Sequence, residues 1–480
     1  MRYALMLAVS ILAGAGGGAA AGASAGGEAL DHVNVPVPAH QSVTLANGLQ
    51  LILVPRHDIP LVAFNLLLRG GAQLDPPARD GTAALAADLL THGAGARDAH
   101  AFVDAVEGAG GNLDAAARSE FIQVQGQFLA RDGRLMLDLL ADAVLHPRFD
   151  AGEFDKLRTR RIEELKATKD SSPDALLGSY GRALLFAGHP YGRPVGGSEL
   201  SLARITREDV ARFYAAQFGA DRATLVIAGD FDPAVIRDDV AAVFGGWQRS
   251  VQPLPPLAVP ARISGRRVLL VDAPGAAQSY FWLANVGVPR RYPERAALNM
   301  ANIAFGGGLG SMLNQELRVR AGLTYDASSH FTRGAVAGEF AISSFTETAN
   351  TARALELALA TLAKLKHDSL DAEAIDSARS YLLGQYPLAF ETPGDWAVAL
   401  GDLELYGLPE SYIGQFGTQL LKVDAGAIRA IIDGVFPSPA DLAIVVIGDA
   451  ARISAAAAQL GPVTTLPLSA PDFTPVSGAR

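Results

Sequence analysis

The first strong pattern along the chain is an alternation of apolar and polar residues with the period of a β-strand. Residues 43–54, VTLANGLQLILV, alternate on both sides of Asn47-Gly48, and Asn-Gly between such runs is a strong hairpin signal. Residues 61–69 predict a further strand, and the apolar run at 224–230, TLVIAGD, predicts a short buried strand. We therefore expect a sheet that begins with a hairpin.

Other segments of the first half have helical character. Residues 81–92 are rich in alanine and predict a mostly buried helix, and residues 154–166 and 205–218 predict two more. Residues 108–128 predict a glycine turn followed by strands. Hairpins and separate helices, without a regular strand–helix alternation, predict an α+β fold.

The second half of the chain repeats the order of elements of the first. Residues 268–271 and 280–286 predict strands that correspond to the early ones, and residues 442–449, LAIVVIGD, repeat the TLVIAGD pattern. Gly448 follows Gly229 by 219 residues (448 − 229). A duplication of this length is too long for a solenoid and predicts two homologous halves.

A proline-rich segment separates these halves. Residues 250–262 contain four prolines and only one charged residue, which is typical of an extended linker. We expect an N-terminal half over residues 26–249 and a C-terminal half over residues 263–480.

A glycine-rich segment at residues 305–325, FGGGLGSMLNQELRVRAGLTY, is the strongest candidate for a functional site. Its middle part predicts a helix, in which Glu316 and Arg320 are four residues apart and form a favourable pair. Gly322 is a natural end for this helix. The segment therefore predicts a helix that ends in a tight glycine turn.

Two side chains of this segment can meet at the turn. Arg318 is placed on the last turns of the predicted helix, and Tyr325 at the start of the strand that follows. A tight turn can direct both into the same cleft. Taken alone, the pattern favours the simpler interpretation, which is a flexible glycine turn, a solvated arginine and a tyrosine in the core.

The order of glycines, a hydrophobic residue, Ser, Leu, Glu-x-Arg, Arg and Gly-Leu-x-Tyr resembles the C-terminal-half signature of the insulinase/pitrilysin (inverzincin) metallopeptidases. In that family the arginine and tyrosine at this seven-residue spacing hold the main chain of the substrate and help to stabilise the tetrahedral intermediate. They match Arg318 and Tyr325. The resemblance covers nearly the whole chain after residue 25, and it implies two halves, each an antiparallel sheet flanked by helices, that close like a clamshell.

The zinc motif of this family, His-x-x-Glu-His, falls in the alanine-rich segment. Positions i, i+3 and i+4 share one helix face, so two histidines bind zinc and the glutamate polarises a water molecule. Ala84, Ala87 and Asp88 stand at these positions, which removes both histidines and the general base. Glu164 matches the third zinc ligand of the family.

A different metal site in the same region stays open as an alternative. Asp88 and His92 are four residues apart and would face the same way, and Glu164 could join them. The simpler interpretation is a histidine at a helix end and an acidic residue on the surface.

The first 25 residues have the features of a cleavable signal peptide. Arg2 precedes an apolar run that is too short to span a bilayer comfortably, and Ala23-Ser24-Ala25 is a small-residue cleavage site. We therefore expect export to the periplasm; an N-terminal membrane anchor is the alternative. No other stretch predicts a membrane span.

Composition excludes several classes of function. The chain has no cysteine, so disulfides and thiolate metal sites are excluded. Its formal net charge is −10, and loss of Arg2 with the leader gives −11, which disfavours nucleic acid as a partner.

The resemblance implies one half of a peptidase site. Some bacterial members of the family look like heterodimers, with the zinc motif on one subunit and the Arg/Tyr pair on the other, and this chain resembles the second kind. We expect a non-catalytic, substrate-binding subunit with no cofactor of its own, active only with a homologous zinc-bearing partner on a peptide substrate. A peptide-binding or scaffold protein without peptidase activity, and an independent metalloenzyme, are the alternatives.

Overall fold

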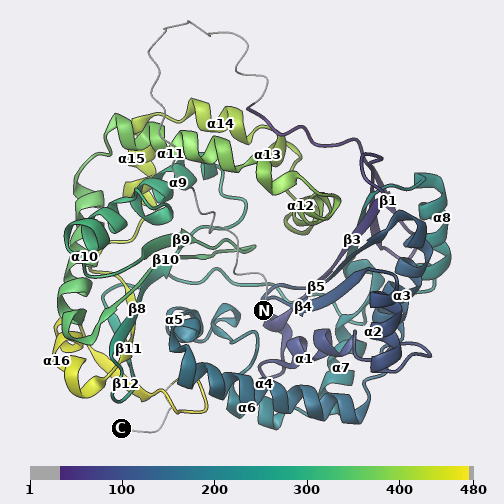
Figure 1. Ribbon diagram of the computed structural model, residues 1–480, viewed down its shortest axis with the longest axis horizontal. Helices are drawn as coiled ribbons and strands as arrows, with labels where there is room; N and C mark the ends of the chain where they lie inside the picture. The colour runs from purple at the N-terminus through teal and green to yellow at the C-terminus, as the bar shows by residue number, and fades with distance from the viewer. Residues whose placement is uncertain (1–32, 475–480) are drawn as a thin grey trace, which may run out of the picture.

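The computed structural model describes residues 33–474 and contains two six-stranded sheets with flanking helices (Figure 1). The predicted signal peptide lies outside the described residues. The prediction of an α+β fold with two similar halves is confirmed. The first sheet has the strand order β1 (Gln41–Thr44), β2 (Gln50–Pro55), β6 (Ala223–Gly229), β3 (Leu61–Arg69), β5 (Phe121–Leu129) and β4 (Asn112–Ala117).

The second sheet repeats five of these six positions, and only the outer strand differs: β1 pairs antiparallel with β2, whereas the C-terminal strand β12 pairs parallel with β7. In both sheets a parallel central pair, β2–β6 or β7–β11, continues into three antiparallel pairings. The sheets are therefore mixed, with antiparallel pairs in the majority. The order in the second sheet is β12 (Val463–Pro467), β7 (Arg267–Asp272), β11 (Ala443–Gly448), β8 (Gln278–Val286), β10 (Glu339–Glu347) and β9 (Ala327–Phe331).

Strand burial follows from position in the sheet. The central strand β3 is buried at all but its two end residues, because helices cover both of its faces. Strand β5 instead alternates between buried and half-buried residues, as a strand with one partly solvated face does. The predicted hairpin around Asn47-Gly48 is present, and Gly48 has the positive φ of 96° that favours glycine in such turns.

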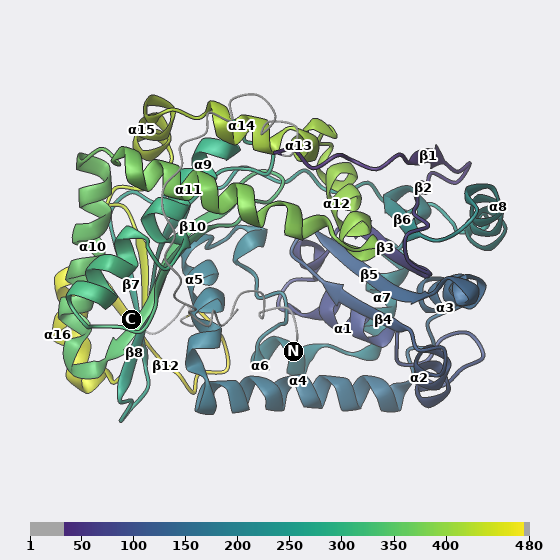
Figure 2. The same ribbon diagram turned by 45° about the horizontal axis from the view of Figure 1, so that its top comes forward.

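Helices of each half form an outer layer over one face of their own sheet, and each layer has its own apolar core (Figure 2). Over the first sheet these are α1 (Thr82–Leu89), α2 (Ala99–Gly108), α3 (Gly133–Leu145), α4 (Ala151–Ser171), α6 (Glu199–Arg204), α7 (Arg207–Gln217) and α8 (Pro233–Phe244). Over the second they are α9 (Arg295–Asn302), α10 (Thr351–His367), α11 (Ala372–Gln385), α14 (Phe416–Lys422), α15 (Ala425–Gly434) and α16 (Ala450–Leu460).

The opposite face of each sheet is covered by a helix from the other half. Helix α5 (Leu177–Leu185) packs on β8 and β11, and α12 (Pro393–Tyr406) packs on β3 and β6. Both contacts require glycine. A Cβ atom on Gly181 would lie 2.7 Å from the Trp282 ring, and one on Gly401 would lie 2.8 Å from Asn65 Nδ2. Each half thus contributes one helix that packs on the sheet of the other half, and these contacts hold the two halves together.

The segment between the two sheets has little regular structure. Residues 251–264 contain no helix or strand, in agreement with their proline content. Within residues 33–474, no helix is long and apolar enough to cross a bilayer.

Candidate functional site

The structure brings Arg318 and Tyr325 together. The guanidinium carbon of Arg318 lies 4.6 Å from the centroid of the Tyr325 ring, within the range of a cation–π contact. Tyr325 is 72% exposed, which is unusual for a large aromatic side chain and excludes a core role. The two side chains therefore form an accessible pair of hydrogen-bond donors.

Arg318 lies on a π-helix and not on an α-helix. The π-helical segment covers Asn314–Arg320, and the hydrogen bond from Ala321 N to Glu316 O, 3.1 Å, closes its wide turn. The predicted pair of Glu316 and Arg320 forms an ion pair of 2.7 Å, and Gly322 ends the segment with a φ of 63°. Single π-turns are rare and occur frequently at functional sites.

The loop that carries Tyr325 is fixed from both sides. Ser344 on β10 donates to the carbonyl of Asp326 at 2.7 Å, and its Oγ lies 3.1 Å from Thr324 Oγ1. Strand β9 starts at Ala327, so Tyr325 precedes the strand by two residues and does not begin it. Because its neighbours are held, the Tyr325 side chain projects from an ordered turn.

A buried asparagine, which the sequence analysis did not single out, connects the glycine run to this loop. Asn314 donates to Gly308 O at 3.1 Å and accepts from Ala327 N at 3.2 Å. A Cβ atom on Gly306 would lie 2.4 Å from Ser329 Oγ, so this glycine allows a close approach of chain segments. In the sequence Asn314 is one of several polar residues of this segment, beside Gln315 and Glu316, so nothing there singled it out.

A cavity of about 340 Å³ lies beside this loop, between α5 and strands β8–β10. The buried Glu339 carboxylate forms an ion pair with Arg182 at 3.5 Å and lies 3.9 Å from His330 Nε2. Burial, with a smaller contribution from the Asp174 carboxylate, raises the pKa of Tyr280. The lining residues are Asp174, Leu177, Gly178, Arg182, Tyr280, Trp282, Asp326, His330, Glu339, Ser343, Ser344 and Phe345.

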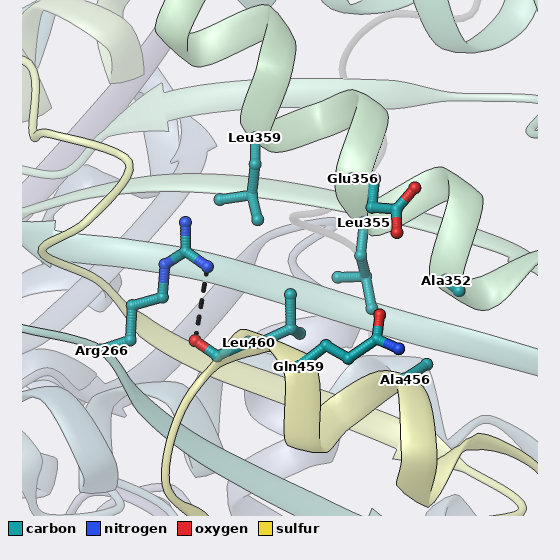
Figure 3. Close-up of a pocket in the computed structure, with 8 residues that line it drawn as sticks. All are labelled: Arg266, Ala352, Leu355, Glu356, Leu359, Ala456, Gln459 and Leu460. Atoms are coloured by element: carbon teal, nitrogen blue, oxygen red, sulfur yellow. Dashed lines mark hydrogen bonds between the residues drawn. The ribbon is translucent and has the colours of Figure 1, made fainter.

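A second, smaller cavity of about 180 Å³ lies in the outer layer between α10 and α16 (Figure 3). Arg266 borders it and donates to the carbonyl of Leu460 at 3.4 Å. None of its lining residues belongs to the segment that carries Arg318 and Tyr325, so it is separate from the candidate site.

The helix that corresponds to the zinc motif carries no ligand set. Ala84 and Ala87 are buried in the core, and the Asp88 carboxylate pairs with Arg161 through Nε and Nη2, both at 2.7 Å. His92 donates from Nδ1 to the carbonyl of Asp88 at 2.8 Å. The Asp88 carboxylate, which the alternative metal site would need as a ligand, is therefore already paired with Arg161.

Glu164, which matches the third zinc ligand of the family, also has another partner. Glu164 is 65% exposed and lies 3.7 Å from Arg160 on the same helix, α4. Within residues 33–474, no three His, Asp or Glu side chains are grouped so that they could hold a metal ion. The residues present do not fit a zinc ion.

The Asp88–Arg161 pair gives a first prediction. Arg161→Met should lower the free energy of unfolding by about 1–3 kcal/mol, because the largely buried Asp88 carboxylate loses its partner. Arg160→Met on the same helix removes only an exposed pair, so it should change stability by less than about 0.5 kcal/mol. Urea denaturation of both variants measures the difference, and equal effects would show that the Asp88 pair has no special role.

The first sheet ends in an open strand. Strand β4 is the last in the strand order and, in the part of the chain from residue 33 to residue 474, pairs only with β5. The strands predicted within residues 108–128 are thus present as β4 and β5. An edge strand can take up an extended peptide through main-chain hydrogen bonds.

Two family models match this chain. The model described as "Insulinase (Peptidase family M16)" matches residues 52–198, and the one described as "Peptidase M16 inactive domain" matches residues 204–382.

Curated relatives are similar over most of their length. An uncharacterized zinc protease of Mycobacterium leprae is 28% identical, covering 76% of this chain and 82% of that protein. A protein named "Non-peptidase homolog YmxG" from Helicobacter pylori is 24% identical, covering 82% of this chain and 90% of that protein.

Solved structures share the fold. A peptidase M16 inactive domain from Pseudomonas fluorescens has a TM-score of 0.79 at 23% identity, covering 85% of this chain and 98% of its own. A protease from Helicobacter pylori has a TM-score of 0.78 at 20% identity, covering 85% of this chain and 99% of its own. These two structures support the two-sheet architecture.

Proposed function

Because this chain belongs to the insulinase family of M16 peptidases, we propose that it is the non-catalytic, substrate-binding subunit of a heterodimeric zinc peptidase. The partner would be a homologous subunit that carries the zinc motif. The two subunits together would cleave peptides, and this chain alone would not.

The observation that carries the proposal is the contrast between the two half-sites of the chain. The Arg318–Tyr325 pair is accessible and held in place, whereas Ala84 and Ala87 are buried and Asp88 is bound to Arg161. A protein that bound no peptide would have no use for an exposed, positioned pair of donors. The names of a similar family model and of a similar protein, an inactive domain and a non-peptidase homolog, support the lack of independent activity.

The chemical role of the pair follows from its donors. Arg318 stays charged and offers several N–H groups, so it would donate to a substrate carbonyl or to the developing oxyanion. Tyr325 would donate from its hydroxyl to the same region. In the partner, zinc would activate the attacking water. We place this complex in the periplasm, on the basis of the predicted signal peptide.

Association with the partner is the direct test of the proposal. Co-expression with an exported homologue that carries His-x-x-Glu-His should give a joint peak in size-exclusion chromatography, and only the mixture should cleave peptides. Separate migration of the two chains at micromolar concentration, with no activity on mixing, would refute the heterodimer. It would favour the alternative, a peptide-binding scaffold.

Metal analysis tests the remaining alternative, an independent metalloenzyme. After dialysis against zinc, the isolated chain should hold no stoichiometric metal, because Arg161 neutralises Asp88 and Glu164 lies with Arg160. Elemental analysis measures the content. One tightly bound zinc per chain that is lost in Asp88→Ala or His92→Ala would contradict this expectation.

A further inference from the structure

Three arginines converge where the two halves meet, in a cluster that the proposed function does not use. Arg290 follows β8, Arg295 begins α9, and Arg333 lies in the turn between β9 and β10. They surround Tyr412 of the short helix α13 (Ser411–Gly414), which lies near α9 and α12 in both views (Figure 1, Figure 2). We call these four residues the arginine cluster.

The cluster is compact. The guanidinium carbon of Arg295 lies 3.4 Å from the centroid of the Tyr412 ring, and that of Arg290 lies 5.9 Å from the same centroid. Arg295 is only 6% exposed and donates to the carbonyl of Tyr412. Burial lowers the pKa of Arg333, and the positive charges of Arg290 and Arg295 lower it further. The three cations therefore repel one another in a poorly solvated place.

Negative charge at the cluster does not balance these cations. Arg290 pairs with Asp402 of α12 at 2.6 Å. Within residues 33–474, neither Arg295 nor Arg333 forms an ion pair with a carboxylate. The Glu120 carboxylate accepts a hydrogen bond from the Tyr406 hydroxyl, and the Tyr406 ring lies against Arg290. Glu120 also accepts from the Tyr191 hydroxyl and from Ala335 N. The hydrogen bonds of Glu120 come from neutral donors and leave its charge in place, so three cations with Asp402 and Glu120 leave a formal excess of one positive charge.

The cluster also contains unused hydrogen-bonding groups. Among the residues that the structure describes, buried Arg290 Nε, Arg333 Nη1 and the Tyr412 hydroxyl have no hydrogen-bond partner. A buried donor without a partner is costly, and a buried unpaired charge is more so. Cationic guanidinium groups match the oxygens of carboxylates and phosphates through paired N–H groups. An anion with several oxygens would therefore match these groups.

We propose that the arginine cluster is a binding site for a small oxyanion, either a free phosphate-type ion or the carboxylate end of a peptide. The oxyanion accepts from Arg333, Arg290 and Tyr412, while Arg295, stacked between Tyr412 and Phe416, contributes charge. Because α9, α12 and α13 all contribute residues around this point, the bound anion strengthens their contact. This site does not depend on a zinc-bearing partner, so its test uses the full chain alone.

The test compares phosphate with chloride at equal ionic strength. Sodium phosphate should raise the melting temperature in a saturable way, and isothermal titration should give one site per chain, because a ligand that binds only the folded state stabilises it. In Arg333→Gln the phosphate affinity should fall at least tenfold, while Arg353→Gln, which changes an exposed arginine on α10, should leave it unchanged. Without phosphate, Arg333→Gln should be as stable as the parent or more so, since one uncompensated charge is removed.

Opposite results overturn the site. The proposal fails if phosphate acts no better than chloride and no carboxylate binds, or if Arg333→Gln retains full phosphate binding. Should that variant not fold, phosphate must slow phenylglyoxal labelling of Arg290 and Arg333 in the parent chain, but not of Arg353; equal labelling rates would refute the site. A short peptide with a free C-terminus, compared with its amide, separates the two sources. Binding of the free acid alone, competed by phosphate, indicates a peptide end, and phosphate binding alone indicates a free ion.

Discussion

Replacing Arg318 by alanine is expected to slow peptide cleavage by the assembled complex by about 10²–10³-fold, since one oxyanion-type donor contributes roughly 2.7–4 kcal/mol to the transition state. Tyr325→Phe should have a similar effect, because it removes the hydroxyl and keeps the ring that contacts Arg318. Both side chains are accessible and outside the core, so neither change should disturb folding. The measurements are kcat and KM of the complex, together with the melting temperature and assembly of each variant.

The chain offers a matched control for this experiment. Arg320 lies two residues after Arg318 on the same π-helix, is 64% exposed and pairs with Glu316. Arg320→Ala should therefore leave the rate unchanged and alter stability by no more than about 0.5 kcal/mol. If Arg318→Ala and Tyr325→Phe leave the rate at the parent level as well, the pair is ordinary surface structure and the proposed function loses its main support.

Strands were the most predictable part of this fold. The boundaries predicted for residues 61–69 coincide with β3, and the TLVIAGD and LAIVVIGD segments coincide closely with β6 and β11. These are short apolar runs in the centre of a sheet, where burial on both faces leaves a clear pattern in the sequence. The duplication was visible for the same reason, since equivalent central strands repeat their pattern.

Features that depend on tertiary contact were not predictable. The i, i+4 spacing of Glu316 and Arg320 predicted an α-helix, but that pair forms equally well in the observed π-helix. The exchange of α5 and α12 between the sheets depends on Gly181 and Gly401, whose close contacts are distant in sequence. The arginine cluster has the same origin, because three separate segments, around residues 290–295, 333 and 412, meet there.

The sequence predicted which two residues form the candidate site, but not the residues that hold the surrounding loop in place. Arg318 and Tyr325 were identified from their spacing, and the structure places them in contact. Asn314 and Ser344, which fix the surrounding loop, are ordinary polar residues in the sequence and acquire their role only through the fold. Likewise, Ala84 and Ala87 showed that a ligand set was missing, but only the structure shows Arg161 on Asp88.

Helix α1 retains its position although its sequence lacks the zinc motif, and a carboxylate outside the helix holds its first turn. Asp75, 4% exposed, accepts from Gly81 N through Oδ2 and from Ala83 N through Oδ1, both at 2.7 Å. Gly81, at the N-terminal end of α1, has a φ of 99° and no side chain that could cap the helix. Asp75 therefore satisfies two of the N–H groups that every helix leaves free at its start.

Asp75→Ala is accordingly expected to lower the free energy of unfolding by about 2–6 kcal/mol, because two buried N–H groups each lose a partner at about 1–3 kcal/mol. Asp424→Ala is the matched control, since Asp424 caps α15 at an exposed position and accepts from Ala427 N at 2.7 Å; its loss should cost about 0.5–2 kcal/mol. Urea denaturation compares the two variants. An Asp75 variant no less stable than the Asp424 variant would show that α1 is held by its packing in the core alone. A clearly larger loss, with weaker hydrogen-exchange protection confined to α1, would show that buried capping keeps this helix in place without a metal.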